Sequence, residues 1–84
     1  MNKEYIKFNL SEAVEQLKKT LERMDNDKKY SEIEYELDME HAYHHLNHAW
    51  NARNEPTEKT KKCEQSDFDK WRQFPTDIDF GEDT

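Results

Sequence analysis

The sequence has few of the residues that build a large hydrophobic core. Leu, Ile, Val and Phe together account for 13 of its 84 residues. No stretch approaches the ~18 consecutive apolar residues of a membrane span. So short and polar a chain excludes a large enzyme and allows one small domain. A net charge of -7 beside so few strong hydrophobes is, taken alone, typical of a disordered chain.

Glycine and proline are also scarce, and this scarcity opposes disorder. The chain has one glycine and two prolines, whereas aromatic residues make up 12% of it. Disordered chains show the opposite balance, being rich in proline and glycine and poor in aromatic residues. The composition therefore excludes a collagen-like or low-complexity chain, and we expect a folded domain.

Cysteine is almost absent. Cys63 is the only one, which excludes an intrachain disulfide and any metal site built from several thiolates. We expect an ordinary reduced thiol there. The first ten residues lack the apolar stretch of a secretory signal, so the expected location is the cytoplasm.

Basic surface is missing as well, because the charge is unevenly distributed. Residues 31–55 carry -5 and residues 67–84 carry -4. Affinity for nucleic acids and for anionic membranes comes mainly from lysine and arginine, so neither is an expected partner. The acidic surfaces favour a basic protein as partner, although solubility alone is an alternative explanation for them.

What the chain does have is helical periodicity. Over residues 9–24 the apolar residues recur at spacings of four and three: Leu10, Val14, Leu17, Leu21 and Met24. Asn9 is a predicted N-cap, with Glu12 three residues later. These features predict a first helix with one narrow apolar seam.

A second helix is predicted over residues 31–54. Ser31 and Glu34 have the spacing of a capping box, and Pro56 prevents easy continuation beyond the end. Its apolar stripe also follows four and three: Tyr35, Met39, Ala42, Leu46, Ala49 and Arg53. Two such seams joined by a short polar loop predict an antiparallel helical hairpin.

The rest of the chain is expected to cover this hairpin. Residues 55–66 are predicted to be a polar connection, and residues 67–84 a short third helix followed by an extended acidic, aromatic tail. Because two narrow seams leave other apolar residues without partners, we expect a homodimer that forms a four-helix-like bundle. The predicted fold class is thus all-α.

The four histidines of the chain lie within eight residues of the second helix, at relative positions i, i+3, i+4 and i+7. A pair at i, i+4 can place two imidazoles on one divalent metal. The candidate ligands are His41, His44, His45, His48 and Asp38. Asp38, His41 and His45 form a three-ligand set suited to Zn, Ni or Fe(II). By the predicted periodicity this arc points away from the apolar stripe.

Two alternative hypotheses explain the same histidines without a metal. They could pack beneath the aromatic residues of the tail or lie half wet on the surface, as amphipathic rings do. They could also act together as a pH sensor, because unperturbed imidazoles titrate near pH ~6.5.

Catalysis has little support, because a chain with one glycine has no glycine-rich loop for an oxyanion or a phosphate. The leading hypothesis is a non-enzymatic interaction module that binds a basic protein, and the alternative is a metal-binding protein. The predicted partner-binding residues are aromatic or charged: Trp71, Arg72, Phe74, Glu36 and Glu40.

Overall fold

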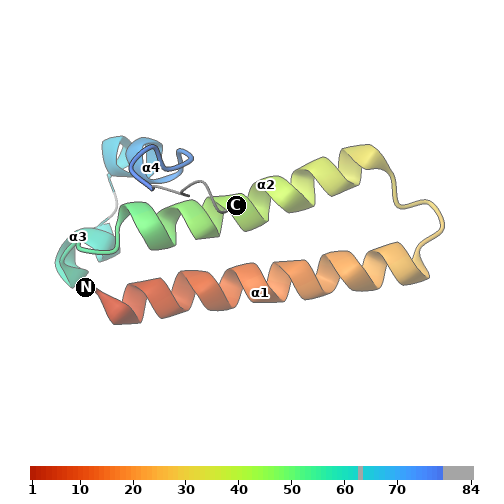
Figure 1. The fold of residues 1–84 in the computed structure, drawn as a ribbon, viewed down its shortest axis with the longest axis horizontal. Helices are drawn as coiled ribbons and strands as arrows, with labels where there is room; N and C mark the ends of the chain where they lie inside the picture. Colours follow the sequence, from red (N-terminus) through yellow and green to blue (C-terminus); the bar gives the residue numbers. More distant parts are fainter. Residues whose placement is uncertain (63, 79–84) are drawn as a thin grey trace.

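The computed structural model describes residues 1–62 and 64–78, and within these ranges the chain folds into helices joined by turns (Figure 1). The helices are α1 (Lys3–Asn26), α2 (Glu32–Asn51), α3 (Thr57–Lys62) and α4 (Gln65–Trp71). The two long helices, α1 and α2, run antiparallel and side by side, and α4 packs on α2. The predicted all-α hairpin is therefore confirmed. Cys63 and the end of the predicted tail, residues 79–84, lie outside the described residues.

Helix α1 begins earlier than the sequence pattern predicts. Its N-cap is Asn2, whose side chain accepts a hydrogen bond from the backbone N–H of Tyr5 at 3.2 Å. The Asn2 backbone N–H and side-chain amide also donate to the carbonyl oxygens of Arg53 and Glu55, which ties the start of the chain to the end of the hairpin. Asn9, the predicted cap, is instead a buried residue inside the helix.

Helix α2 begins as predicted, with Ser31 at the N-cap position, but the capping box is not formed. The Ser31 side chain makes no capping hydrogen bond, and the Glu34 carboxylate pairs with Arg23 of α1 at 2.7 Å. Because Glu34 pairs with Arg23 across the hairpin, its carboxylate does not complete the capping box.

The predicted polar connection, residues 55–66, contains helix α3. The carbonyl oxygen of Pro56 accepts hydrogen bonds from the backbone N–H groups of Lys59 and Thr60 and so opens this helix. Proline lacks the N–H that a first helical turn leaves unpaired, so it is favourable there. Pro56 therefore starts α3, whereas α2 already ends at Asn51, before the predicted residue 54, and the predicted polar connection is partly helical.

Helix α4 begins before the predicted residue 67, and an irregular segment follows it. Asp77 of that segment accepts a hydrogen bond at its Oδ1 from Trp50 Nε1 of α2 at 2.8 Å, and the Arg53 guanidinium lies 3.9 Å from the centre of the Trp50 ring. Trp50 thus binds the segment after α4, and its hydrogen bond lowers the pKa of Asp77.

The two long helices meet along a face that only partly overlaps the predicted one, because Ala42 and Ala49 of the predicted α2 stripe are buried there. The buried residues of α1 are Asn9, Ala13 and Thr20, and those of α2 include Ala42 and Ala49. The predicted seam residues of α1 stay largely exposed; for example, Leu17 keeps 41% and Leu21 keeps 64% of their accessible surface. Helix α1 is therefore turned by about one residue, or 100°, from the predicted orientation. Helix α2 is turned in the same sense, which leaves Tyr35 and Leu46 exposed while the small Ala42 and Ala49 stay buried.

Because both turns have the same sense and the helices are antiparallel, the two predicted stripes lie on the same side of the hairpin. We call this side the apolar face. Its residues are Leu10, Val14, Leu17, Leu21 and Met24 of α1 with Tyr35, Met39 and Leu46 of α2. Helix α4 covers the opposite side, where it packs on α2.

None of the described helices is both long and apolar enough to cross a membrane.

Candidate functional site

The contact between α1 and α2 consists mainly of polar side chains that bind one another, and we call this contact the polar seam. On α1 its residues follow the spacing of four and three, with two small or hydroxyl side chains between the polar ones: Asn9, Ala13, Gln16, Thr20 and Arg23. On α2 the partners are His45, His41, Asp38 and Glu34. Ala13 and the alanines of α2 allow the helices to approach closely enough for these bonds.

An ion-pair cluster closes the seam near the loop. Arg23 Nη1 lies 3.2 Å from both carboxylate oxygens of Asp38, and Arg23 Nη2 lies 2.7 Å from Glu34 Oε2. The Tyr30 hydroxyl donates to Asp38 Oδ2 at 2.7 Å. Burial and this hydrogen bond raise the pKa of Tyr30 to about 12. Asp38 is thus fully engaged in joining the two helices.

Two histidines bind α1 through their Nδ1 atoms. His41 Nδ1 lies 2.6 Å from Gln16 Oε1, and His45 Nδ1 lies 2.9 Å from Asn9 Oδ1. The Nε2 atoms of the two histidines then lie 3.2 Å from each other. His41 and His45 therefore face the hairpin seam, and for these two the prediction that the histidines point away from the helix contact is corrected.

The predicted three-ligand metal set is not assembled. Asp38 binds Arg23 and Tyr30, while His41 and His45 bind the amides of α1. Among the residues that the structure describes, no three His, Cys, Asp or Glu side chains are grouped so that they could hold a metal ion. Of that three-ligand set, the structure brings together the His41 and His45 imidazoles, and the His44 ring centre lies 5.1 Å from that of His45 and 4.3 Å from that of His48.

The other two histidines lie beneath the aromatic residues of α4. The Phe68 ring centre is 5.3 Å from that of His44 and 5.7 Å from that of His48. Trp71 meets His48 edge to face at 6.1 Å between ring centres. For His44 and His48, this arrangement fits the alternative hypothesis that the histidines pack under aromatic residues.

His48 is the most deeply buried of the four, with 3% of its surface exposed. Burial, and then its neighbours His44 and His45, lower its pKa from 6.5 to about 4. Burial lowers the pKa values of His44 and His45 in the same direction. The Nδ1 atom of His48 lies 3.1 Å from the Tyr5 hydroxyl, whereas its Nε2 and the Trp71 Nε1 are buried without a hydrogen-bond partner among the described residues. A neutral imidazole suits this site because a charged one would be poorly solvated.

Two asparagines of α2 hold the end of α4. Asn47 Nδ2 donates to the carbonyl oxygen of Arg72 at 2.8 Å, and Asn51 Nδ2 donates to those of Trp71 and Gln73 at 2.8 and 2.7 Å. The last carbonyl groups of a helix lack partners within it, so these amides cap α4 from the neighbouring helix.

The predicted partner-binding residues fall into different environments. Trp71 has no exposed surface, so it anchors α4 in the core and offers no ring to a partner. Phe74 is 58% exposed and packs edge to face on Tyr43. Arg72 is exposed, as are Glu36 and Glu40 on the outer side of α2.

An open groove brings part of this set together. Glu40, Arg72 and Phe74 line it together with the histidines 41, 44 and 45 and Phe68. Glu36 lies outside it, in a depression on the outer side of α2 that Tyr35 and Met39 also line.

Asn9 and Gln16 are the site residues that the apolar pattern does not identify. Both face the histidines, and the polar residues of α1 repeat at the same spacing of four and three as the apolar ones. In the sequence, these residues belong to a second heptad-like series that includes amides and a guanidinium, and each member precedes a member of the apolar series by one residue.

Comparison with protein-family models, with curated proteins and with solved structures finds no match for the chain.

Proposed function

We propose that the chain is a non-enzymatic interaction module whose binding surface is the apolar face and whose partner there is a second copy of the same chain. The observation that carries this proposal is the rotation of both helices. This rotation places the polar residues in the seam between α1 and α2 of one chain. It leaves the apolar residues of both helices together on one exposed side.

The register of the hairpin supports a coiled-coil-like dimer. The hydrogen bonds that His45 and His41 donate to the amide oxygens of Asn9 and Gln16 fix which residues of α1 and α2 are level. By this register Leu10 is level with Leu46, Leu17 with Met39 and Leu21 with Tyr35. Such apolar layers, at alternating spacings of four and three, are what knobs-into-holes packing of four helices needs.

The side chains of the apolar face are available to a partner. Of the eight, seven retain between 40% and 64% of their surface. A standard interface buries about 800 Å² per partner, and these side chains would form its apolar centre. A monomer that left so continuous an apolar surface in water would be unusual.

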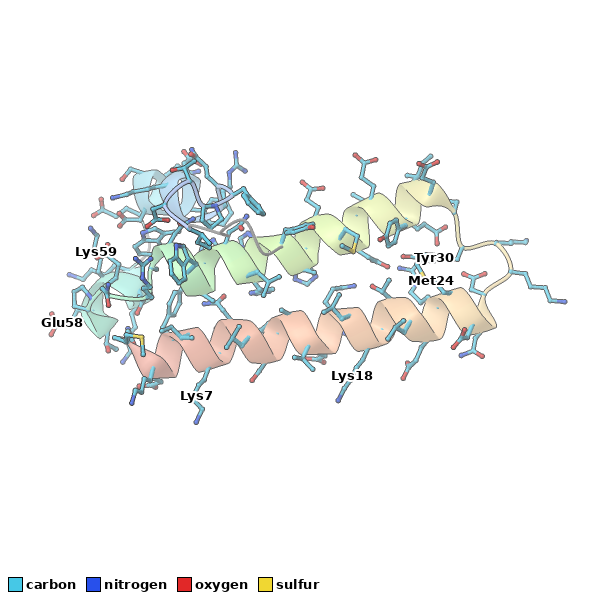
Figure 2. The ribbon with its side chains drawn as sticks, viewed as in Figure 1. Lys7, Lys18, Met24, Tyr30, Glu58 and Lys59 are labelled. Carbon is cyan, nitrogen blue, oxygen red and sulfur yellow. The ribbon has the colours of Figure 1, made fainter. Side chains whose placement is uncertain are left out.

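The charges beside the apolar face favour one orientation of the second copy. On α1 its outer edge carries Lys7 and Lys18, which point away from α2 (Figure 2). On α2 the outer edge carries glutamates, and Lys18 is level with the stretch between Glu36 and Glu40. A twofold axis along the hairpin lays α1 on the partner's α2, so each Lys18 meets the acidic edge of the other copy. The expected basic partner of the acidic edge is then the lysine edge of a second chain.

The test is the mass of the particle in solution with Leu17→Glu and a matched control. Leu17→Glu places a charge in the middle of the apolar face, and Leu37→Glu places the same charge on an exposed leucine of α2 that lies off this face. By light scattering over a range of concentrations, we expect the wild type and Leu37→Glu to be dimers and Leu17→Glu to be a monomer. A monomeric wild type, or equal masses of the two variants, would contradict the proposal.

The orientation has its own test, by charge reversal. Lys18→Glu and Glu36→Lys should each weaken the dimer severalfold, and the double variant should recover most of the loss, because rim charge pairs contribute ~0.2–1 kcal/mol each. If a wild type without self-association instead binds a basic protein and Leu17→Glu prevents that binding, the partner on this face is that protein and not a second copy.

A further inference from the structure

We propose that the Nε2 atoms of His41 and His45 form a two-imidazole binding site for a divalent cation that prefers nitrogen ligands, Cu²⁺ above all and Zn²⁺ after it. The two atoms lie 3.2 Å apart on successive turns of α2, with the ring centres 4.9 Å apart. The site lies on the side of the polar seam away from the apolar face, so it does not depend on dimerisation.

The hydrogen bonds around Gln16 set the tautomer of His41. The Thr20 hydroxyl donates to the backbone carbonyl of Gln16 at 3.0 Å, so its oxygen is free to accept from Gln16 Nε2 at 3.2 Å. This fixes the amide with its oxygen toward His41, 2.6 Å from Nδ1. An amide oxygen can only accept, so the proton lies on His41 Nδ1 and the Nε2 of the neutral ring carries a lone pair.

Asn9 sets the tautomer of His45 in the same way. Its Nδ2 donates to the backbone carbonyl of Tyr5 at 3.1 Å, which leaves Asn9 Oδ1 facing His45 Nδ1 at 2.9 Å. The proton of His45 therefore also lies on Nδ1. Two independent chains of hydrogen bonds thus give the two histidines the same tautomer.

The consequence is that two nitrogen lone pairs face each other at hydrogen-bond distance. Two acceptors repel each other unless a cation lies between them. A metal ion about 2.0 to 2.1 Å from each nitrogen would subtend an N–metal–N angle of roughly 100° across this pair, within the range of tetrahedral and square-planar sites. Amide oxygens on the opposite ring nitrogens are the usual outer partners of metal-binding histidines, and they orient the rings and make them better ligands.

The surroundings leave the remaining coordination positions open. In residues 1–62 and 64–78 no third acidic, cysteine or histidine side chain completes the group. His41 is exposed and lines the open groove together with His45, so solvent and a metal ion reach the pair. We therefore expect a two-nitrogen site that keeps water ligands. Such a site discriminates against Mg²⁺ and Ca²⁺, which need oxygen ligands.

The test is titration of the full chain with Cu²⁺ and with Zn²⁺ at pH 7.5, by calorimetry and by electron paramagnetic resonance of the copper form. We expect one ion per chain, tighter for Cu²⁺, with nitrogen couplings from two imidazoles. His41→Ala should weaken binding at least about tenfold, and Gln16→Ala, which removes the outer partner, should weaken it by about tenfold as well. The matched control is His44→Ala, which should change the affinity less than twofold.

Because His41 is exposed, His41→Ala should keep the fold, and circular dichroism without metal checks this; His41→Gln is the second variant. Equal binding by wild type and His41→Ala, or equal losses in His41→Ala and His44→Ala, would overturn the proposal. So would ¹⁵N resonances that show one proton shared between the two Nε2 atoms at pH 7.5 and persisting when Cu²⁺ is added.

Discussion

Asn9 Oδ1 lies 2.9 Å from His45 Nδ1 between the two helices of the hairpin, where an apolar contact between helices would be the common solution. Asn9 is 2% exposed, and its amide nitrogen is engaged with the Tyr5 carbonyl. Both ends of one buried side chain are therefore satisfied, one within α1 and one across to α2. Buried polar groups stabilise a contact only when they are paired in this way.

Asn9→Ala should therefore destabilise the hairpin. The substitution leaves the Nδ1–H group of His45 half-buried without its acceptor, and a lost partner of this kind costs about 1 to 3 kcal/mol. Urea unfolding followed by circular dichroism measures the change in the free energy of unfolding. Ser11→Ala, an exposed position on the same helix, is the control and should change it by less than about 0.5 kcal/mol. Equal stability of the two variants would show that the amide contributes nothing across the seam.

The helices themselves follow from local sequence signals, whereas their relative rotation does not. The polar loop separates the two long helices where the structure does, although α2 ends at Asn51 and not at the predicted residue 54, and the apolar spacing establishes that both segments are helical. Which face turns inward depends on pairs distant in sequence, such as Arg23 with Asp38. Two series at the same spacing, one apolar and one polar, run side by side on α1, and periodicity alone does not choose between them.

The same reason explains the candidate site. The histidine spacing identifies His41 and His45 as a pair, but the sequence assigns them an aspartate that the structure places with Arg23 and Tyr30. Position on a helix face can suggest a side chain as third metal ligand, but residues of the neighbouring helix can bind the same side chain instead. In this hairpin Arg23 of α1 binds the Asp38 carboxylate.

The ion-pair cluster near the loop predicts an unusual tyrosine. Tyr30 should ionise near pH 12, because burial and the hydrogen bond to Asp38 both oppose a negative phenolate. Asp38→Asn removes the carboxylate charge, so the pKa of Tyr30 should fall toward 10. Absorbance of the phenolate between pH 9 and 13 measures both values. Tyr30→Phe shows which part of the absorbance change belongs to Tyr30. An unchanged Tyr30 titration in Asp38→Asn would contradict the role given to the carboxylate.

Asn51 predicts how α4 is held. Its side-chain amide caps the carbonyl groups of Trp71 and Gln73, so Asn51→Ala should cost about 1 to 2 kcal/mol and release the end of α4. Hydrogen exchange should become faster over residues 65–73 and remain unchanged in the middle of α1. Asn54→Ala, at an exposed position beyond α2, is the control. Faster exchange spread evenly over all helices would mean that Asn51 supports the whole fold and not α4 alone.

His48 makes the stability of the protein depend on pH in a definite direction. Its pKa is about 4 in the folded protein and 6.5 in the unfolded chain, so between these values the unfolded chain binds more protons. Stability is then fully present above pH 6.5, decreases as the pH falls from 6.5 to 4, and reaches its lowest level below 4. Between pH 7 and pH 5 the loss should be on the order of 1 to 2 kcal/mol. Urea unfolding at several pH values measures this loss of stability. Comparison with His48→Gln separates this histidine from the other titrating groups, because the glutamine variant keeps hydrogen-bonding atoms but takes up no proton. The two pH profiles should run parallel above pH 6.5 and below pH 4 and differ in slope between these values. Profiles that are parallel over the whole range would show that the buried imidazole does not control the acid sensitivity of the fold.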